Sequence, residues 1–305
     1  MSAPAPLLQI ALFATASRFA TRALQELVAA HWRVVAVALF RPKSPGLRGT
    51  LLAFAGPRRL SAFEQCAREL GIPLIAVTGC NGAQVAERLR SLRPDLICIA
   101  TFPRLIPPEI TRLAPLGSIN VHPSLLPRHR GPLPLFWTYH ADDRSTGVTV
   151  HHASQTFDAG DIILQESFPL PRAYPLTALN EDVAQRGAAL LRSAADALAR
   201  GRASRVAQDE RAATYAPRVS VGAPMVRFDA WDVERVWHFL TALSPRFREP
   251  LTDSAGRAVL YRTVTGFERG ACRAPGSVET VGAGWRLHCR GGVVLLDSRP
   301  EPSRA

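Results

Sequence analysis

Residues 7–40 read LLQIALFATASRFATRALQELVAAHWRVVAVALF, and this stretch decides the fold. Apolar residues dominate 7–13, which predicts a buried strand, and across 17–30 they recur at the spacing of a helix. A second apolar run over 34–40 predicts another buried strand. A strand, a helix and a strand in this order predict two parallel strands joined by a crossover helix.

The same alternation continues along the next part of the chain. Helices are expected over 60–70 and 83–92, and strands over 73–77 and 95–100. We therefore expect an α/β fold with a doubly wound, mostly parallel sheet and helices on both faces. The first strand-to-helix turn, 14–17, contains no glycine, and the sequence has no G-x-G-x-x-G or P-loop motif. These absences argue against a nicotinamide dehydrogenase and an NTPase.

The length of 305 residues predicts two domains, because one core rarely fills a chain of this size. Beyond a proline-punctuated stretch lies a predicted helix over 229–243, followed by short strands separated by glycines. These strands are expected over 258–266, 276–281, 285–289 and 293–296. The pattern is typical of a small, OB-like β-barrel. We expect a catalytic domain over 1–205, a linker over 206–224 and the β-barrel domain over 225–305.

The chain is strongly basic, with a formal net charge of +12 and a pI of about 10.7. An excess of positive charge favours a polyanionic partner such as nucleic acid, or an anionic substrate. All of the 37 basic residues except Lys43 are arginine, however, and such a skew can also reflect coding bias. Both explanations of the charge remain open at this point.

The cysteines and the hydropathy pattern bear on where the protein works. The 5 cysteines form no C-x-x-C pair and no short spacing with histidine, so we expect no structural metal. An odd count without a disulfide framework favours a reducing cytoplasm. The sequence shows no leader pattern at its start and no run of roughly 20 apolar residues, so we expect a soluble, cytoplasmic protein with no membrane span.

The densest group of candidate functional residues is GSINVHPSLLP, over 117–127. Apolar Ile119 and Val121 alternate with polar residues, so a strand here would place Asn120 and His122 on one face. Pro123 should end the strand, which puts His122 at the edge where α/β sheets form their sites. A polar strand end exposed to solvent is the alternative.

A second group is the turn DAGD, over 158–161. Acidic residues beside a glycine often only cap a solvated turn. In combination with the first group they suggest chemistry, because an amide, a histidine and one buried carboxylate suffice for acyl transfer to an amine. The amide can donate to the oxyanion, the histidine can manage a proton, and the carboxylate can orient the histidine.

Together these stretches resemble the signature of the folate-dependent formyltransferases. The resemblance rests on NVHPSLLP over 120–127, RG at 130–131, TGVT over 146–149 and DAGDI over 158–162. Within that family the chain is most similar to the members that formylate methionyl-tRNA. That similarity includes QDE over 208–210, TYAP over 214–217, and a P-x-x-P-x-x-R-G pattern from Pro42 to Gly49.

The resemblance implies roles for the matching residues. Asn120, His122 and Asp158 would be the catalytic trio, and 10-formyltetrahydrofolate would be the formyl donor. The residues implied to contact this cosubstrate are Phe102, Ser124, Leu125, Leu126, Pro127, Phe157 and Asp161. The acceptor would be the amino group of methionyl initiator tRNA, with no covalent enzyme intermediate and no metal. His129, His140, His151 and His152 match no catalytic position and are expected to be structural or solvated.

The resemblance implies the donor and leaves the acceptor amine open. Between residues 27 and 63 the chain carries six basic residues and no acidic one, including Arg41, Lys43 and Arg48, which coincide with the family's tRNA-contacting loop. An RNA backbone would suit these six uncompensated cations. The turn after the first strand departs from the G-T-P-x-F of the tRNA enzymes, however. A small amine such as a nucleotide-linked amino sugar, or a non-catalytic RNA-binding role, remains an alternative. No protein partner is evident.

Overall fold

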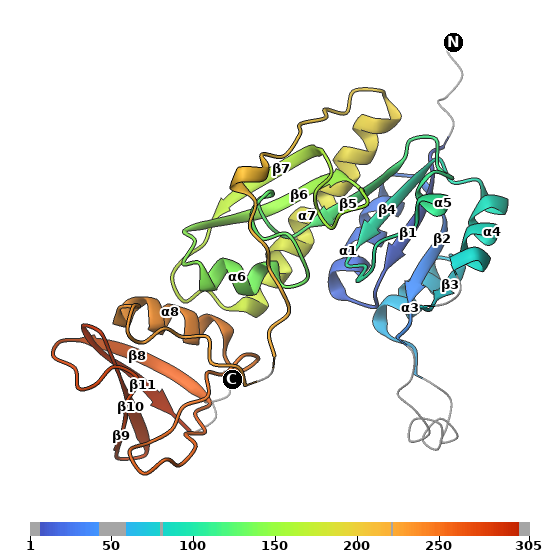
Figure 1. The fold of residues 1–305 in the computed structure, drawn as a ribbon. Helices are drawn as coiled ribbons and strands as arrows, with labels where there is room; N and C mark the ends of the chain where they lie inside the picture. The colour runs from blue at the N-terminus through green and yellow to red at the C-terminus, as the bar shows by residue number, and fades with distance from the viewer. Residues whose placement is uncertain (1–6, 43–58, 80–81, 221, 299–305) are drawn as a thin grey trace. The chain divides into compact units, whose positions relative to one another are not determined.

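The computed structural model describes residues 7–42, 59–79, 82–220 and 222–298 (Figure 1). The elements of the N-terminal half are β1 Gln9–Ala14, α1 Arg18–Ala29, β2 Arg33–Phe40, α3 Ala62–Glu69, β3 Leu74–Val77, α4 Gly82–Leu92, β4 Leu96–Ala100, α5 Pro108–Thr111 and β5 Ser118–His122. They are followed by α6 Pro134–His140, β6 Ser145–His152, β7 Ile162–Pro169, α7 Leu176–Ala199 and the short 3-10 helix η1 Glu210–Ala212. None of the helices that the structure describes is long and apolar enough to cross a lipid bilayer.

A seven-stranded sheet forms the larger layer, in the order β3-β2-β1-β4-β5-β6-β7. The strands from β3 to β5 are parallel, and β6 runs antiparallel to β5. The order reverses beside β1, where the chain moves from β3 at one edge to β4 on the other side. This topology confirms the predicted doubly wound, mostly parallel α/β fold.

The helices cover both faces of this sheet because the central strands are apolar throughout. Phe13 on β1 and Ile99 on β4 face α4 and α5, which contribute Leu89 and Ile110 to the same buried cluster. Helix α1 lies on the opposite side of the sheet from α4 (Figure 1). It begins where the Ser17 hydroxyl accepts a hydrogen bond from the Ala20 N–H.

The C-terminal part contains α8 Val233–Leu243 and the strands β8 Thr263–Arg269, β9 Val278–Val281, β10 Gly284–Cys289 and β11 Gly292–Asp297. The strands form a four-stranded antiparallel sheet in the order β8-β11-β10-β9, and α8 packs against β8 and β11. A separate small β domain was predicted, and the structure provides it as this sheet.

Two predicted boundaries in this part were wrong. The helix begins at Val233 rather than at residue 229, because the Asp232 carboxylate caps it by accepting from the Arg235 N–H. The first strand runs over Thr263–Arg269 rather than 258–266, because the chain before it is held in a separate turn. There, Asp253 accepts hydrogen bonds from the N–H groups of Ala255 and Arg257.

The chain divides into two compact units that do not follow chain order. The first comprises 1–132, 147–167 and 180–215, and the second comprises 133–146, 168–179 and 216–305. The catalytic candidates all belong to the first unit. Helix α6, which the sequence analysis did not predict, belongs to the second, where the Phe136 ring lies 5.6 Å from that of Phe239 on α8.

Candidate active site

The carboxyl end of β5 supplies the first two candidate residues. The strand ends at His122, as the following proline predicts, and the apolar side chains of Ile119 and Val121 are buried. Asn120 and His122 both lie within reach of Asp158, which confirms that they share a face. The structure therefore brings the three predicted catalytic residues together.

Asp158 is the centre of this cluster. Its Oδ1 accepts a hydrogen bond from Asn120 Nδ2 (3.2 Å) and lies 3.5 Å from His122 Nδ1. Its Oδ2 accepts from the Gly131 N–H (2.8 Å). Asp158 has a φ of 55°, a left-handed conformation that aspartate tolerates better than most residues.

The tight turn around Asp158 depends on Gly160. A Cβ at this position would lie 1.8 Å from the His152 carbonyl oxygen, so no larger residue fits without moving the backbone. Gly160 therefore lets the turn lie against the end of β6, because glycine has no side chain between the two backbones.

The electrostatics of the cluster favour a charged carboxylate and a neutral histidine. Burial works to raise the pKa of Asp158, but His122, His151 and the Gly131 N–H outweigh it and lower the pKa to about 2. Burial lowers the pKa of His122, against the opposing effect of the Asp158 charge. At neutral pH the site therefore holds an anionic Asp158 beside a neutral His122.

The hydrogen bonds of His122 define where its proton lies. Its Nε2 is 2.9 Å from the His129 carbonyl oxygen, which can only accept, so Nε2 carries the hydrogen. The lone pair of Nδ1 consequently faces Asp158. A proton arriving at Nδ1 would be stabilised by this carboxylate, so the pair is suited to take up and return a proton during a reaction.

A small hollow opens beside the cluster. It is lined by the chain after β4, including Phe102 and Arg104, by the turn from Ala153 to Asp158, and by Asn120 and His151. Its volume is about 50 Å³, so it fits only the reacting end of a larger ligand. His122 is not among the side chains that line it, whereas His151, to which the sequence analysis gave no site role, is.

Only some of the residues implied to contact the cosubstrate line the hollow. Phe102 and Phe157 line the hollow, and the Phe102 ring is held edge-on to Phe13 at 5.3 Å. Ser124 and Leu126 are buried, so the loop they belong to would meet a ligand through its backbone or its other side chains. Leu125 and Pro127 do not line the hollow, and Asp161 instead pairs with Arg205 (3.2 Å).

The loop over 124–131 is held by hydrogen bonds to the neighbouring strands. The Thr149 hydroxyl donates to the Ser124 carbonyl oxygen (2.7 Å) and accepts from the Leu126 N–H (3.2 Å). Gln165 donates to the Leu126 carbonyl oxygen (2.9 Å). These bonds fix the loop whose Gly131 N–H supports Asp158.

A second set of contacts ties this loop to the segment after α7. Arg130 donates to both carboxylate oxygens of Glu210 (2.8 Å each) and to Gln208 Oε1. Gln208 in turn donates to the carbonyl oxygens of Asp158 (2.8 Å) and Gly160 (2.7 Å). In the sequence these residues stand out only as part of a resemblance, and in the structure they hold the Asp158 turn.

The predicted acceptor-binding residues are only partly described. Lys43 and Arg48 lie outside the described residues. Arg41 was expected to be an uncompensated cation, and that expectation was wrong. Its Nη2 is 2.5 Å from Oε1 of the buried Glu64, which follows directly after the segment that contains no acid. We therefore assign Arg41 a structural ion pair.

Comparison with known proteins bears on this geometry. Residues 8–195 match the family model described as formyl transferase. The chain belongs to the formyltransferase family. The match spans the whole large sheet and includes Asn120, His122 and Asp158, so the cluster lies within the part of this formyltransferase that defines its family. Its activity is formyl transfer.

Several relatives extend along most of this formyltransferase. The methionyl-tRNA formyltransferase of Syntrophus aciditrophicus is 31% identical over 286 residues, covering 93% of this chain and 89% of the relative. That of Moorella thermoacetica is also 31% identical over 286 residues, with coverage of 94% and 89%. The similarity therefore extends beyond the residues that the family model matches.

Solved structures share the fold at lower identity. An N-formyltransferase from Helicobacter canadensis, in complex with folinic acid and dTDP-3-aminofucose, matches with a TM-score of 0.69 and 15% identity, covering 96% of this chain and 99% of that one. HypX from Aquifex aeolicus in complex with tetrahydrofolic acid matches with a TM-score of 0.59 and 18% identity, covering 95% of this formyltransferase and 43% of that chain.

Proposed function

We propose that this formyltransferase transfers a formyl group from 10-formyltetrahydrofolate to the amino group of methionyl initiator tRNA, and so acts in translation initiation in the cytoplasm. The observation that carries the proposal is the similarity to methionyl-tRNA formyltransferases, which covers about nine tenths of both chains. Residues 1–205 would form the catalytic domain, 206–224 the linker and 225–305 a domain that assists acceptor binding.

The residues around the hollow fit a folate donor. Phe102 and Phe157 offer aromatic surface for a flat ring system, and Asn120 and Asp158 line the same hollow. Two of the solved relatives in fold were obtained with folates bound. The donor supplies the formyl group, and the residues of this chain supply its orientation and the charge that stabilises its reaction.

The catalytic cluster suggests how the transfer is accelerated. Asn120 Nδ2 is placed to donate a hydrogen bond to the formyl oxygen as the amine attacks the formyl carbon and that oxygen becomes negative. His122 Nδ1, supported by Asp158, is placed to stabilise the proton that leaves the amine and to assist its movement to the departing folate nitrogen. Loss of one oxyanion donor would cost roughly 3 kcal/mol.

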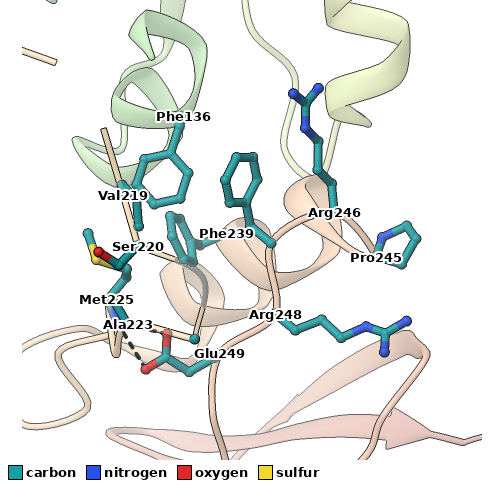
Figure 2. A pocket seen from close by; sticks show the side chains of 12 residues that line it. Phe136, Val219, Ser220, Ala223, Met225, Phe239, Pro245, Arg246, Arg248 and Glu249 are labelled. Atoms are coloured by element: carbon teal, nitrogen blue, oxygen red, sulfur yellow. Dashed lines mark hydrogen bonds between the residues drawn. The ribbon is translucent and has the colours of Figure 1, made fainter. Parts of the chain in front are cut away.

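An RNA acceptor is supported by a hollow in the second unit. It has a volume of about 320 Å³, and its wall contains the rings of Phe136, Phe239 and Phe247 (Figure 2). Arg246 and Arg248 extend from the loop after α8, and neither forms an ion pair within the part of the chain that the structure describes. Aromatic rings beside unpaired guanidinium groups suit an unpaired nucleotide and its phosphate.

The test is a donor-consumption assay with 10-formyltetrahydrofolate. Methionyl initiator tRNA and a panel of nucleotide-linked amino sugars are compared as acceptors, with Asn120→Ala and His122→Ala as controls. Rapid formylation of the tRNA that falls about 100-fold or more in both variants is the expected result. Turnover with a sugar alone would replace the tRNA by a small amine. Absence of turnover with wild-type protein would contradict the proposed activity on both acceptors.

A further inference from the structure

His151 lies beside Asn120 but has no role in the proposed mechanism. Asn120 on β5 and His151 on β6 are directly opposite each other in the antiparallel pair, so their side chains lie on the same face of the sheet. The His151 side chain is buried, at 2% exposure, and lines the hollow together with Asn120 and Asp158.

The hydrogen bonds of His151 fix its tautomer. Its Nδ1 lies 2.8 Å from the carbonyl oxygen of His152, which can only accept, so the hydrogen of the neutral ring is on Nδ1. Nε2 therefore carries a lone pair. This atom is 3.0 Å from Asn120 Nδ2 and accepts a hydrogen bond from it. His151 thus has the opposite tautomer to His122, whose hydrogen is on Nε2.

Two acceptors consequently hold the Asn120 amide. Its nitrogen donates to His151 Nε2 and to Asp158 Oδ1, and a flipped amide would turn its oxygen toward both of these acceptors. The two acceptors differ in strength, since a carboxylate holds an N–H more firmly than a neutral ring nitrogen does. Asp158 therefore holds one hydrogen of the amide firmly, and His151 sets the direction of the other.

We propose that His151 is a positioning residue, which keeps the Asn120 amide turned so that its nitrogen, and not its oxygen, is directed at the reacting carbonyl. The proposal rests on the proposed role of Asn120 in formyl transfer and adds no further step to it. Because the contact sets the orientation of the group that stabilises the oxyanion and His151 touches neither substrate, its loss should affect kcat more than either KM.

The experiment compares two substitutions that differ in one property. In His151→Gln the side-chain oxygen can reach the place of Nε2 and accept from Asn120, whereas His151→Met has a similar reach and offers only a weakly accepting sulfur. We expect kcat to fall roughly five- to tenfold in His151→Met, with both KM values within about twofold, as expected for loss of one neutral hydrogen bond. His151→Gln should recover most of this loss.

A second set of variants distinguishes positioning from a general structural effect. In an Asn120→Ala background, His151→Met should cause no further loss of kcat, because the group it positions is gone. Equal losses in His151→Gln and His151→Met, or an undiminished loss in the Asn120→Ala background, would overturn the proposal. The kcat values of the variants are compared using whichever amine the wild-type protein formylates. The comparison therefore does not depend on whether that amine is on methionyl-tRNA.

A measurement without substrate completes the test. In ¹⁵N-histidine spectra of the whole protein at neutral pH, with His151→Gln used to assign the signal, His151 should show a protonated Nδ1 and an unprotonated Nε2. The Nε2 signal should shift in Asn120→Ala. The opposite tautomer, or an Nε2 signal at the same position in wild-type protein and in Asn120→Ala, would refute the proposed contact. This result does not depend on finding the acceptor of the reaction.

Discussion

Replacing Asp158 by asparagine changes the charge of the cluster with almost no change of shape. The carboxylate accepts one N–H from Asn120 on Oδ1 and another from Gly131 on Oδ2. An asparagine has a single oxygen, so one of these N–H groups would face an NH₂ group instead. The variant also removes the negative charge from beside His122 Nδ1. We expect kcat to fall about 100-fold or more, since both Asn120 and His122 lose their support.

The same substitution should lower stability by an amount that depends on pH. The environment lowers the pKa of Asp158 to about 2, below the value near 3.9 of an unfolded chain, which corresponds to roughly 2.5 kcal/mol in favour of the folded state at neutral pH. Because the folded pKa is the lower one, this contribution is complete above about pH 5 and is lost as the pH falls toward 2.

Denaturant unfolding of the two proteins at pH 7, 4 and 3 measures this contribution, and a formyl-transfer assay measures kcat. The difference in the free energy of unfolding between wild-type protein and Asp158→Asn should be largest at pH 7 and should narrow at each lower pH. A difference that stays constant with pH would show that the charge of Asp158 does not stabilise the fold. A kcat within threefold of wild type would refute its support of Asn120 and His122.

Three further variants test other parts of the molecule. Gly160→Ala should lower kcat at least tenfold, because its Cβ would meet the His152 carbonyl oxygen, whereas Gly266→Ala, with open space around it, should not. Burial lowers the pKa of His238 to about 4, so stability should fall by roughly 2–3 kcal/mol between pH 6.5 and 4, and His238→Asn, which can still accept from the Ala173 N–H, should show a flatter dependence. The double variant Arg246→Ala and Arg248→Ala should weaken tRNA binding and reduce the slope of log Kd against log salt by about 1.5, as measured by filter binding.

Each of these variants has an outcome that would contradict its reason. Equal activity of the two glycine variants would mean that the turn tolerates a side chain. A stability of His238→Asn that falls as steeply as that of wild type would assign the acid sensitivity to other groups. Arg257→Ala is the control for the double variant, because Arg257 is already paired with Asp253. An equal change of the salt slope in Arg257→Ala would show that Arg246 and Arg248 do not contact the tRNA more than a paired arginine does.

The parts of the fold that follow from local pattern were predictable. The apolar runs of β1 and β4 and the proline after His122 each carry their signal within a few residues, and the strand end and the shared face of Asn120 and His122 followed from them. The resemblance to the formyltransferases then added Asp158, which lies 38 residues from Asn120 and which spacing alone could not have joined to it.

The parts that were missed depend on pairing between distant residues. His151 meets Asn120 only through the register of β5 and β6, and alternation within either strand does not fix that register. Arg41 appeared uncompensated because its partner, Glu64, lies 23 residues away on α3. Helix α6 contains aromatic residues with weak helical preference, and it is stabilised by packing within its unit, including the contact of Phe136 with Phe239.

The contacts of Arg130 and Gln208 determine when, during synthesis of the chain, the active site can become complete. The trio and the whole seven-stranded sheet leave the ribosome before Gln208 does, yet Gln208 holds the carbonyl oxygens of Asp158 and Gly160. A chain cut after α7 would contain every strand of the sheet and all three residues, and its Asp158 turn would still lack this support. Competence for catalysis is therefore expected to arise only when the segment through Tyr215 has docked, well after the sheet itself can form.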